Sequence, residues 1–216
     1  MWTIFSKGGP VMYPLAACSV IALSVIIDRT IFWIKHSLQR KPSLVAEILE
    51  FYRRGELEAI RKKTAGCRDF VVKVLVSGIV HREFSMVKAM EAAATEEIKR
   101  MRRFMPVLDT MITVAPLLGI FGTVIGIISS FEILGTAGIE HPQAVTAGIA
   151  QALITTAAGL GIAILSVFPY NYFNSRVENA VLTIEQYATG LEVVSQKQVA
   201  QTAMAGSLQD ENSAAG

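Results

Sequence analysis

The sequence predicts an all-α membrane protein with three transmembrane helices. Of its 216 residues, 52% are hydrophobic and only 18% are charged, and the mean hydropathy is +0.45, which lies outside the usual range of soluble domains. Residues 114–131 and 145–170 contain no Asp, Glu, Lys, Arg or His. With their flanks, both stretches reach the roughly 20 apolar residues that cross a bilayer. Seventeen of the 20 Lys and Arg residues fall between Arg29 and Arg103, so the basic residues belong to one compartment.

The first predicted span covers residues 11–34 and follows a short periplasmic N-terminus, residues 1–10. Only Lys7 precedes it and no small-residue cleavage site follows it, so we interpret it as a retained span and not a signal peptide. Trp33 is at the depth of an interfacial aromatic belt. Asp28 and Arg29 near the same end are expected to anchor the helix at the interface, with Arg29 reaching the headgroups; a functional ion pair is the alternative.

Residues 35–104 are predicted to form a cytoplasmic helical domain. Residues 35–103 hold 16 basic and 9 acidic side chains and no apolar run long enough to cross a membrane. We expect four helices, at residues 44–53, 56–63, 69–81 and 86–103. Gly55 and Gly66 separate the first three, and Ser43 and Ser85 are the expected N-caps of the first and last.

The second and third spans are predicted at residues 105–134 and 144–173. Their connection, residues 135–143, lacks Lys and Arg, and so the positive-inside rule makes it periplasmic and the basic domain cytoplasmic. The N-terminus then lies outside and the C-terminus inside. We expect helices 2 and 3 to extend into the cytoplasmic domain.

The extension of the third helix, residues 174–195, carries a predicted heptad seam. Apolar residues recur at steps of four and three, as in a helix that packs against neighbours: Val177, Val181, Ile184, Ala188 and Leu191. Residues 196–216 are small and polar with little to bury, and we predict a disordered tail there.

Polar side chains recur at helical spacing on both central spans. On the second span they follow Asp109, which we place at the cytoplasmic pore entrance; on the third they lie on one stripe, with Thr156 about 100° further round. The predicted pore-lining residues are Thr113, Thr123, Ser130, Gln151, Thr155 and Thr156. The alternative for any single threonine is a packing hydrogen bond, which contributes about 0.6 kcal/mol in a membrane.

The glycines of these spans predict close helix packing, because small residues four apart let two backbones approach. The predicted packing residues are Gly119, Gly122, Gly126, Gly148, Gly159 and Gly161. They follow no strand and lack the lysine of a phosphate-binding loop. Proton relays in membranes use ionisable side chains, but no Asp, Glu, His, Lys or Arg lies between Asp109 and Glu132 or between Pro142 and Ser175. A partner must therefore supply the titrating group.

Chemistry beyond ion passage has no support in the sequence. Cys18 and Cys67 lie far apart, and His36, His81 and His141 are scattered and interpreted as surface residues. We find no nucleophile–base pair, metal cluster or cofactor loop. We therefore expect no enzyme activity, no cofactor, no metal and no nucleic-acid partner.

Three stretches carry a resemblance: GGPVMYPLAACSVIALSVIIDRTIFW, APLLGIFGTVIGIISSF and GIAQALITTAAGLGIAILSVFPYNYF. The sequence resembles the MotA/TolQ/ExbB proton-channel family, closest to its ExbB and TolQ branch. The resemblance implies that the chain is a ring-forming subunit of a homopentamer in the bacterial inner membrane. It also implies an ExbD- or TolR-like single-span protein dimer in the pore, which carries a membrane aspartate, and a TonB- or TolA-like periplasmic transducer.

Within that resemblance, Thr123 in FGTVIG and Thr156 in ITTAAGL match the family's pore threonines, which are expected to face the partner's aspartate. Gln151 departs from the pattern, because relatives commonly have glutamate there, and an amide cannot titrate. Thr155 stands where alanine is common.

The sequence thus predicts the channel-forming subunit of a proton-motive-force-driven motor. One alternative is a stator subunit of a flagellar or gliding motor. The domain at residues 35–103 is short for a flagellar stator, which argues against the flagellar motor but not against the gliding motor. The other alternative is a non-conducting membrane scaffold. The residues do not distinguish protons from sodium ions.

Overall fold

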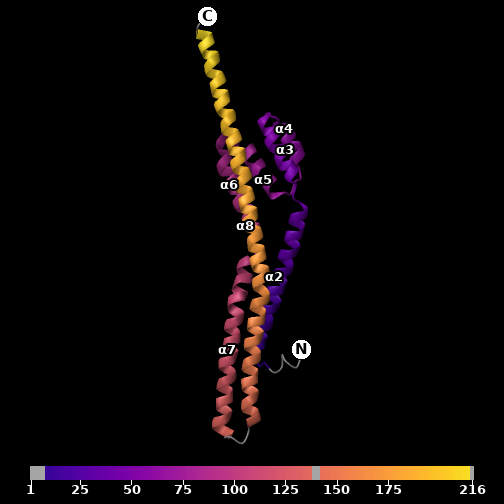
Figure 1. The fold of residues 1–216 in the computed structure, drawn as a ribbon, viewed down its shortest axis with the longest axis vertical. Helices are drawn as coiled ribbons and strands as arrows, with labels where there is room; N and C mark the ends of the chain where they lie inside the picture. Colours follow the sequence, from indigo (N-terminus) through magenta and orange to yellow (C-terminus); the bar gives the residue numbers. More distant parts are fainter. Residues whose placement is uncertain (1–7, 138–141, 215–216) are drawn as a thin grey trace. The chain divides into compact units, whose positions relative to one another are not determined.

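The computed structural model describes residues 8–137 and 142–214, and every regular element within these ranges is a helix (Figure 1). The helices are α2 (Met12–Leu38), α3 (Pro42–Arg53), α4 (Leu57–Thr64), α5 (Phe70–Val80), α6 (Arg82–Met101), α7 (Met105–Ala137) and α8 (Pro142–Ala214). The all-α prediction is confirmed for this part of the chain. Parts of the predicted N-terminal segment and of the periplasmic loop, together with His141, lie outside the described residues.

Three of these helices are long and apolar enough to cross a membrane: α2, α7 and, within α8, Val145–Gln198. They contain the three spans predicted from the sequence. The chain divides into two compact units. We call Met1–Phe32 with Arg102–Ser175 the apolar unit, and Trp33–Met101 with Arg176–Gly216 the polar unit.

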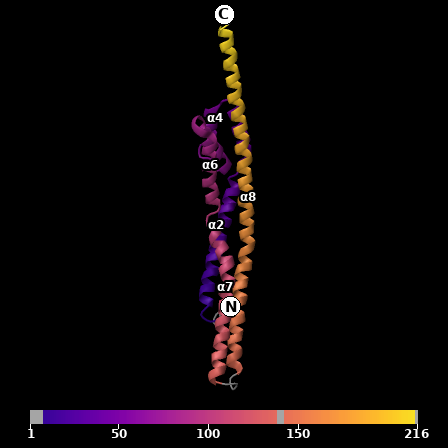
Figure 2. The same cartoon turned by 90° about the vertical axis from the view of Figure 1, so that its left-hand side faces the viewer.

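In the apolar unit, α7 and the first part of α8 lie side by side in both views (Figures 1 and 2). The start of α2 packs on them through Val11, Met12 and Leu15, which form a buried cluster with Ala115 of α7. Many outer positions of the unit are apolar and exposed, including Phe121 at 56% and Leu165 at 72%. Apolar surface of this extent is expected to contact lipid or other chains.

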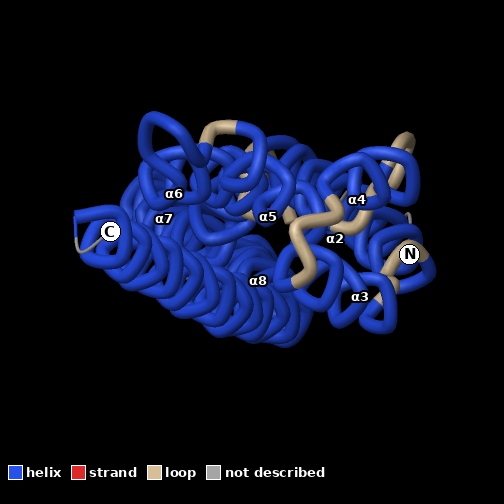
Figure 3. The backbone as a smooth tube through the Cα atoms, turned by 90° about the horizontal axis from the view of Figure 1, so that it is seen from above, coloured by secondary structure: helices blue, strands red, loops and turns tan. Residues whose placement is uncertain are grey.

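The polar unit contains the end of α2, the helices α3 to α6, which short loops connect (Figure 3), and the part of α8 that starts at Arg176. Its buried residues include Val45 and Ile48 of α3 and Leu75 of α5. On α8 the predicted heptad seam is the buried face: Val177, Ile184 and Leu191 are at most 3% exposed, whereas Val181 and Ala188 are half-buried.

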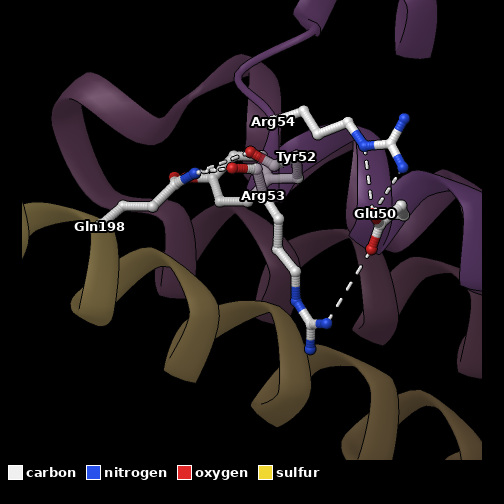
Figure 4. A network of polar contacts seen from close by, with 5 residues as sticks. All are labelled: Glu50, Tyr52, Arg53, Arg54 and Gln198. Atoms are coloured by element: carbon white, nitrogen blue, oxygen red, sulfur yellow. Dashed lines mark hydrogen bonds and ion pairs between the residues drawn. The ribbon is translucent and has the colours of Figure 1, made fainter.

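The end of α3 is tied to α8 within this unit (Figure 4). The Gln198 side-chain nitrogen donates to the carbonyls of Tyr52 and Arg53 at 2.8 and 3.0 Å. The Tyr52 hydroxyl lies 3.2 Å from the Ser195 hydroxyl. Because the last carbonyls of a helix have no partner within it, the amide of Gln198 satisfies groups that water would otherwise solvate.

The predicted helix boundaries in the polar unit are largely confirmed. Gly55 and Gly66 interrupt the helices with φ of 75° and 72°, a conformation that favours glycine. Ser85 has extended backbone angles, and its hydroxyl accepts from the Lys88 amide at 3.4 Å, as an N-cap does.

Ser43 is the exception, since it is not the N-cap of α3. The cap position belongs to Lys41, and Pro42 occupies the first turn. Proline fits there because its ring fixes a helical φ and its missing N–H is not needed. The sequence-based assignment favoured the hydroxyl over this backbone effect.

The C-terminal tail also differs from its prediction. Residues 196–216 were expected to be disordered, yet α8 continues as helix to Ala214. Residues 197–214 are rich in Ala and Gln, which have good helix propensity. Extending an existing helix avoids the unfavourable nucleation step, so a segment with little to bury can still continue it.

Candidate functional site

The contact between α7 and α8 is made by glycines that bring the two backbones together. A Cβ atom at Gly119 would lie 3.0 Å from the Thr155 carbonyl oxygen, and one at Gly126 would lie 2.8 Å from the Gly148 carbonyl oxygen. Gly122 lies against the side chain of Thr155. These distances leave no room for a side chain, as expected for small-residue helix packing in membranes.

Two other predicted packing glycines differ from each other. A Cβ atom at Gly159 would meet the Ala115 carbonyl and would come within 3.1 Å of the Gly119 Cα. A Cβ atom at Gly161 would meet nothing within 4 Å. Gly159 therefore belongs to the α7–α8 contact. Gly161, on another face of α8, has room for a side chain.

Thr123 of α7 and Thr156 of α8 are brought together at this contact. Their hydroxyl oxygens are hydrogen-bonded to each other. The Thr156 hydroxyl lies 3.0 Å from the Gly119 carbonyl oxygen, and the Thr123 hydroxyl lies 3.2 Å from the same atom. Both side chains are half-buried, so the pair sits at the edge of the helix contact and not inside it.

The hydrogen-bonding capacity of this pair exceeds what the chain uses. Each hydroxyl has one donor hydrogen and two acceptor lone pairs. The two hydrogens can go to one another's oxygen, to the Gly119 carbonyl or, at 3.4 Å from Thr123, to the Ala152 carbonyl. A rotation of either hydroxyl would redirect a hydrogen to a water molecule or a carboxylate placed beside the pair.

Two other predicted pore residues are enclosed between the helices. Thr155 is 0% exposed and donates to the Ala152 carbonyl at 2.8 Å. Ser130 is 4% exposed and lies 2.9 Å from the Gly126 carbonyl and 3.1 Å from the Val145 carbonyl. Ser130 therefore joins α7 to α8, as in the packing alternative, whereas Thr155 is enclosed but donates within its own helix.

Gln151 lies against the segment that precedes α2. Gly9 has a φ of 68°, and a Cβ atom there would overlap the Gln151 amide. Only a glycine lets the chain pass so close to this side chain in that conformation. The amide is half-buried and keeps its capacity to hydrogen-bond.

Asp109 and Thr113 are exposed near the start of α7, several turns from the threonine pair along the helix. The Thr113 hydroxyl donates to the Asp109 carbonyl at 3.3 Å. The predicted polar residues of α7 therefore differ in burial: Asp109 and Thr113 are exposed, whereas Ser130 is buried. Of the α7 hydroxyls described above, that of Thr123 is hydrogen-bonded to a hydroxyl of α8.

The Asp28–Arg29 pair is an ion pair with a 2.7 Å contact, but the burial of its two members is unequal. Arg29 is 4% exposed and its guanidinium carbon lies 4.6 Å from the Phe32 ring centre and 5.7 Å from that of Phe104. The side chain is thus held by aromatic faces within the apolar unit, where the sequence predicted that it would extend outward. Asp28 is the exposed partner.

Two structural features could not be predicted from the sequence. Phe104, between α6 and α7, has a φ of 64°, which is uncommon for a bulky residue; the sequence predicted the helix junction here but not this conformation. His36, interpreted as a surface residue, is stacked on Phe70 at 5.0 Å. Among the described residues no group of three or more His, Cys, Asp or Glu could hold a metal ion.

Comparison with known proteins places these features in a family. The sequence model of the MotA/TolQ/ExbB proton channel family matches residues 67–186. The biopolymer transport protein ExbB-like 3 of Synechocystis sp. is 34% identical over 194 residues, which is 87% of this chain and 91% of that protein. An ExbB homolog of Methanothermobacter thermautotrophicus is 33% identical, over 84% of this chain and 66% of its own length.

The Tol-Pal system protein TolQ of Pseudomonas aeruginosa is 35% identical over 114 residues, covering 53% of this chain and 49% of its own. The match to the family model, residues 67–186, contains the α7–α8 contact. Together with three helices able to cross a membrane, these matches show that the chain belongs to the MotA/TolQ/ExbB proton channel family.

Proposed function

We propose that this chain is the channel-forming subunit of a proton-driven motor of the bacterial inner membrane. Copies of the chain form a ring, a pentamer, in which α7 and α8 surround a pore. The periplasmic side holds the N-terminus and the loop between these helices, and the polar unit is cytoplasmic. The motor acts on a TonB- or TolA-type periplasmic transducer.

The exposed apolar surface of the apolar unit supports an assembly of this kind. Phe121, Leu153 and Leu165 are each more than half exposed on α7 and α8. In a membrane such residues contact either lipid or another helix, and small-residue contacts between helices bring copies together. A ring of copies covers part of this surface and leaves the rest to lipid.

The observation that carries the proposal is the hydroxyl pair of Thr123 and Thr156, which lies in stretches of the two spans that contain no Asp, Glu, His, Lys or Arg. Hydroxyls stabilise a carboxylate or an ordered water molecule by hydrogen bonding, but they neither take up nor release a proton near neutral pH. The titrating group therefore comes from a partner, a dimer of an ExbD- or TolR-like single-span protein whose aspartate lies in the pore.

In this mechanism the two threonines act on the partner's carboxylate in turn. When the aspartate is ionised, a hydroxyl rotates and donates to it; when it takes up a proton, the hydroxyl returns to the Gly119 carbonyl. Gln151 orders water by hydrogen bonding and does not titrate. Thr113 and Asp109 lie on the cytoplasmic approach to the pair.

Proton flux into liposomes that contain the chain and its single-span partner tests this mechanism. Substitution Thr156→Ala should lower flux by about tenfold or more, because a hydrogen bond to a charged group contributes about 1.5–3 kcal/mol. Thr156→Ser should restore most of the flux. Thr110→Ala is the matched control, since the exposed Thr110 hydroxyl donates only to the Pro106 carbonyl of its own helix.

Co-purification of the partner with each variant separates a failure of conduction from a failure of assembly. Wild-type flux through a Thr156→Ala complex that retains the partner would refute the role of the hydroxyl pair. A flux that does not change when the partner's aspartate is replaced by asparagine would favour a scaffold.

A further inference from the structure

A cavity of about 220 Å³ lies in the polar unit, between the end of α2, the start of α5 and α8. Polar and aromatic side chains line it: Trp33, His36, Ser37, Arg40, Phe70, Arg176, Asn179, Ala180 and Thr183. None of these described lining residues is acidic. The proposed proton path uses no part of this cavity.

Aromatic rings form a continuous row along the cavity. The Trp33 and His36 rings meet edge to face with centres 5.7 Å apart, and the His36 ring stacks on Phe70 with centres 5.0 Å apart. Trp33 and Phe70 are at most 7% exposed. Because the rings are fixed by their mutual contacts and by burial, they provide a rigid wall.

A guanidinium group stands at each end of this row. The Arg176 guanidinium carbon lies 5.7 Å from the Trp33 ring centre, and the Arg40 guanidinium carbon lies 4.6 Å from the Phe70 ring centre. Guanidinium groups that rest on aromatic faces keep their edge hydrogens directed outward. Arg40 also lies 3.6 Å from the buried carboxylate of Asp69, which orients it.

The position of the cavity along the chain corresponds to the boundary of the membrane. Residues 142–175 contain no charged side chain, and Arg176 directly follows them. Trp33 comes one residue after the part of α2 in the apolar unit. Tryptophan marks the headgroup level, and arginines immediately beyond a span meet the phosphates of the adjoining leaflet.

We propose that this cavity binds the phosphate of an anionic phospholipid headgroup. The Arg176 guanidinium donates paired hydrogen bonds to the phosphate oxygens, and the Arg40 guanidinium, at the other end of the row, adds positive charge to the cavity. Ser37, Asn179 and Thr183 supply donors and acceptors for the hydroxyls of a glycerol headgroup. The aromatic row faces the uncharged part of the headgroup.

Tryptophan fluorescence reports on this site directly. The chain has two tryptophans, so Trp2→Phe leaves Trp33, in the cavity wall, as the single emitter. We expect a saturable change in its emission when dioctanoyl phosphatidylglycerol is titrated into the full chain in a neutral detergent. Dioctanoyl phosphatidylcholine at the same concentration should bind at least fivefold more weakly, because its headgroup has no net charge.

Substitutions in the same background identify the residue responsible. Arg176→Gln should weaken phosphatidylglycerol binding by about five- to tenfold, and Arg176→Lys should restore most of the affinity. Arg176 is preferred to Arg40 because a change at Arg40 would also disturb Asp69. The matched control is Arg102→Gln, which removes an exposed positive charge beside the second span without touching the cavity. An unchanged melting temperature of Arg176→Gln verifies the fold.

Two results would overturn the proposal. One is wild-type affinity in Arg176→Gln; the other is an equal loss in Arg102→Gln, which would indicate diffuse surface attraction. The same titration with soluble glycerol 1-phosphate tests whether the bound phosphate belongs to a lipid or to a free ester. Binding of this compound as tight as that of the lipid would assign the cavity to a free phosphate ester and would reject the lipid.

Discussion

Between α7 and α8 the buried polar side chains are neutral hydroxyls, whereas in the polar unit they are carboxylates. Thr155 donates to a carbonyl of its own helix, and the Ser130 hydroxyl lies within hydrogen-bond distance of one carbonyl on each helix. Asp69 accepts from the amides of Val71 and Lys41, at 2.9 and 2.7 Å. Both regions leave few polar atoms unpaired, but they use groups of different charge.

The difference follows from whether each region contains cations that can balance a buried carboxylate. Glu97 is 8% exposed, yet it lies 2.9 Å from the Lys73 ammonium and 3.1 Å from Arg100, both of which reach water. Residues 105–134 and 144–173, the spans of α7 and α8, contain no Lys, Arg or His that could balance a carboxylate. An isolated charge in a membrane is costly. In the proposed mechanism, the charge beside the α7–α8 contact is therefore supplied by another chain, as the partner's aspartate.

The largest effect is expected from Asp69→Ala in the polar unit. The change removes the N-cap of α5 and leaves the Lys41 amide without its acceptor, so the free energy of unfolding should fall by about 2–4 kcal/mol. Denaturant titration followed by circular dichroism measures this loss. Glu83→Ala, at an exposed ion pair with a 3.9 Å contact, is the control and should change stability by less than about 0.5 kcal/mol. Equal effects of the two changes would contradict the role given to Asp69.

A smaller loss is expected from Gly159→Ala at the α7–α8 contact. The new methyl group would press on the Ala115 backbone, and overpacking of this kind costs about 1–3 kcal/mol. Gly161→Ala, two residues further along the helix, meets no atom within 4 Å and should leave stability unchanged. Thermal unfolding of both variants in the same detergent compares them. If Gly161→Ala were the more harmful, the contact that matters would be with another chain.

The smallest effect is expected from Thr155→Val, which removes one buried hydroxyl and keeps the side-chain volume. The hydroxyl donates to the Ala152 carbonyl of its own helix, so the loss should not exceed the roughly 0.6 kcal/mol typical of a side-chain hydrogen bond in a membrane protein. The same thermal measurement tests it, and proton flux should stay near the wild-type level because Thr155 is enclosed. A strong loss of flux with normal stability would return Thr155 to the pore lining.

Much of the fold could be predicted because it depends on local patterns. Charge-free stretches, helical periodicity and the glycines at 55 and 66 define the helices and their ends. Ser43 and the tail beyond residue 196 were predicted wrongly, since Pro42 dominates the start of α3 and since helix propagation outweighs low hydrophobicity in α8.

The sequence by itself determined the all-helical class, the three apolar spans, the absence of charge from residues 114–131 and 145–170, and the family. Only the tertiary structure decided which hydroxyls are enclosed and which are at an edge, because Thr155 and Thr156 are neighbours in sequence and differ by about 100° around the helix. It also decided that Gly159 and not Gly161 lies at the helix contact. Composition reports that small and polar residues are present, but their partners depend on how two helices are rotated against each other.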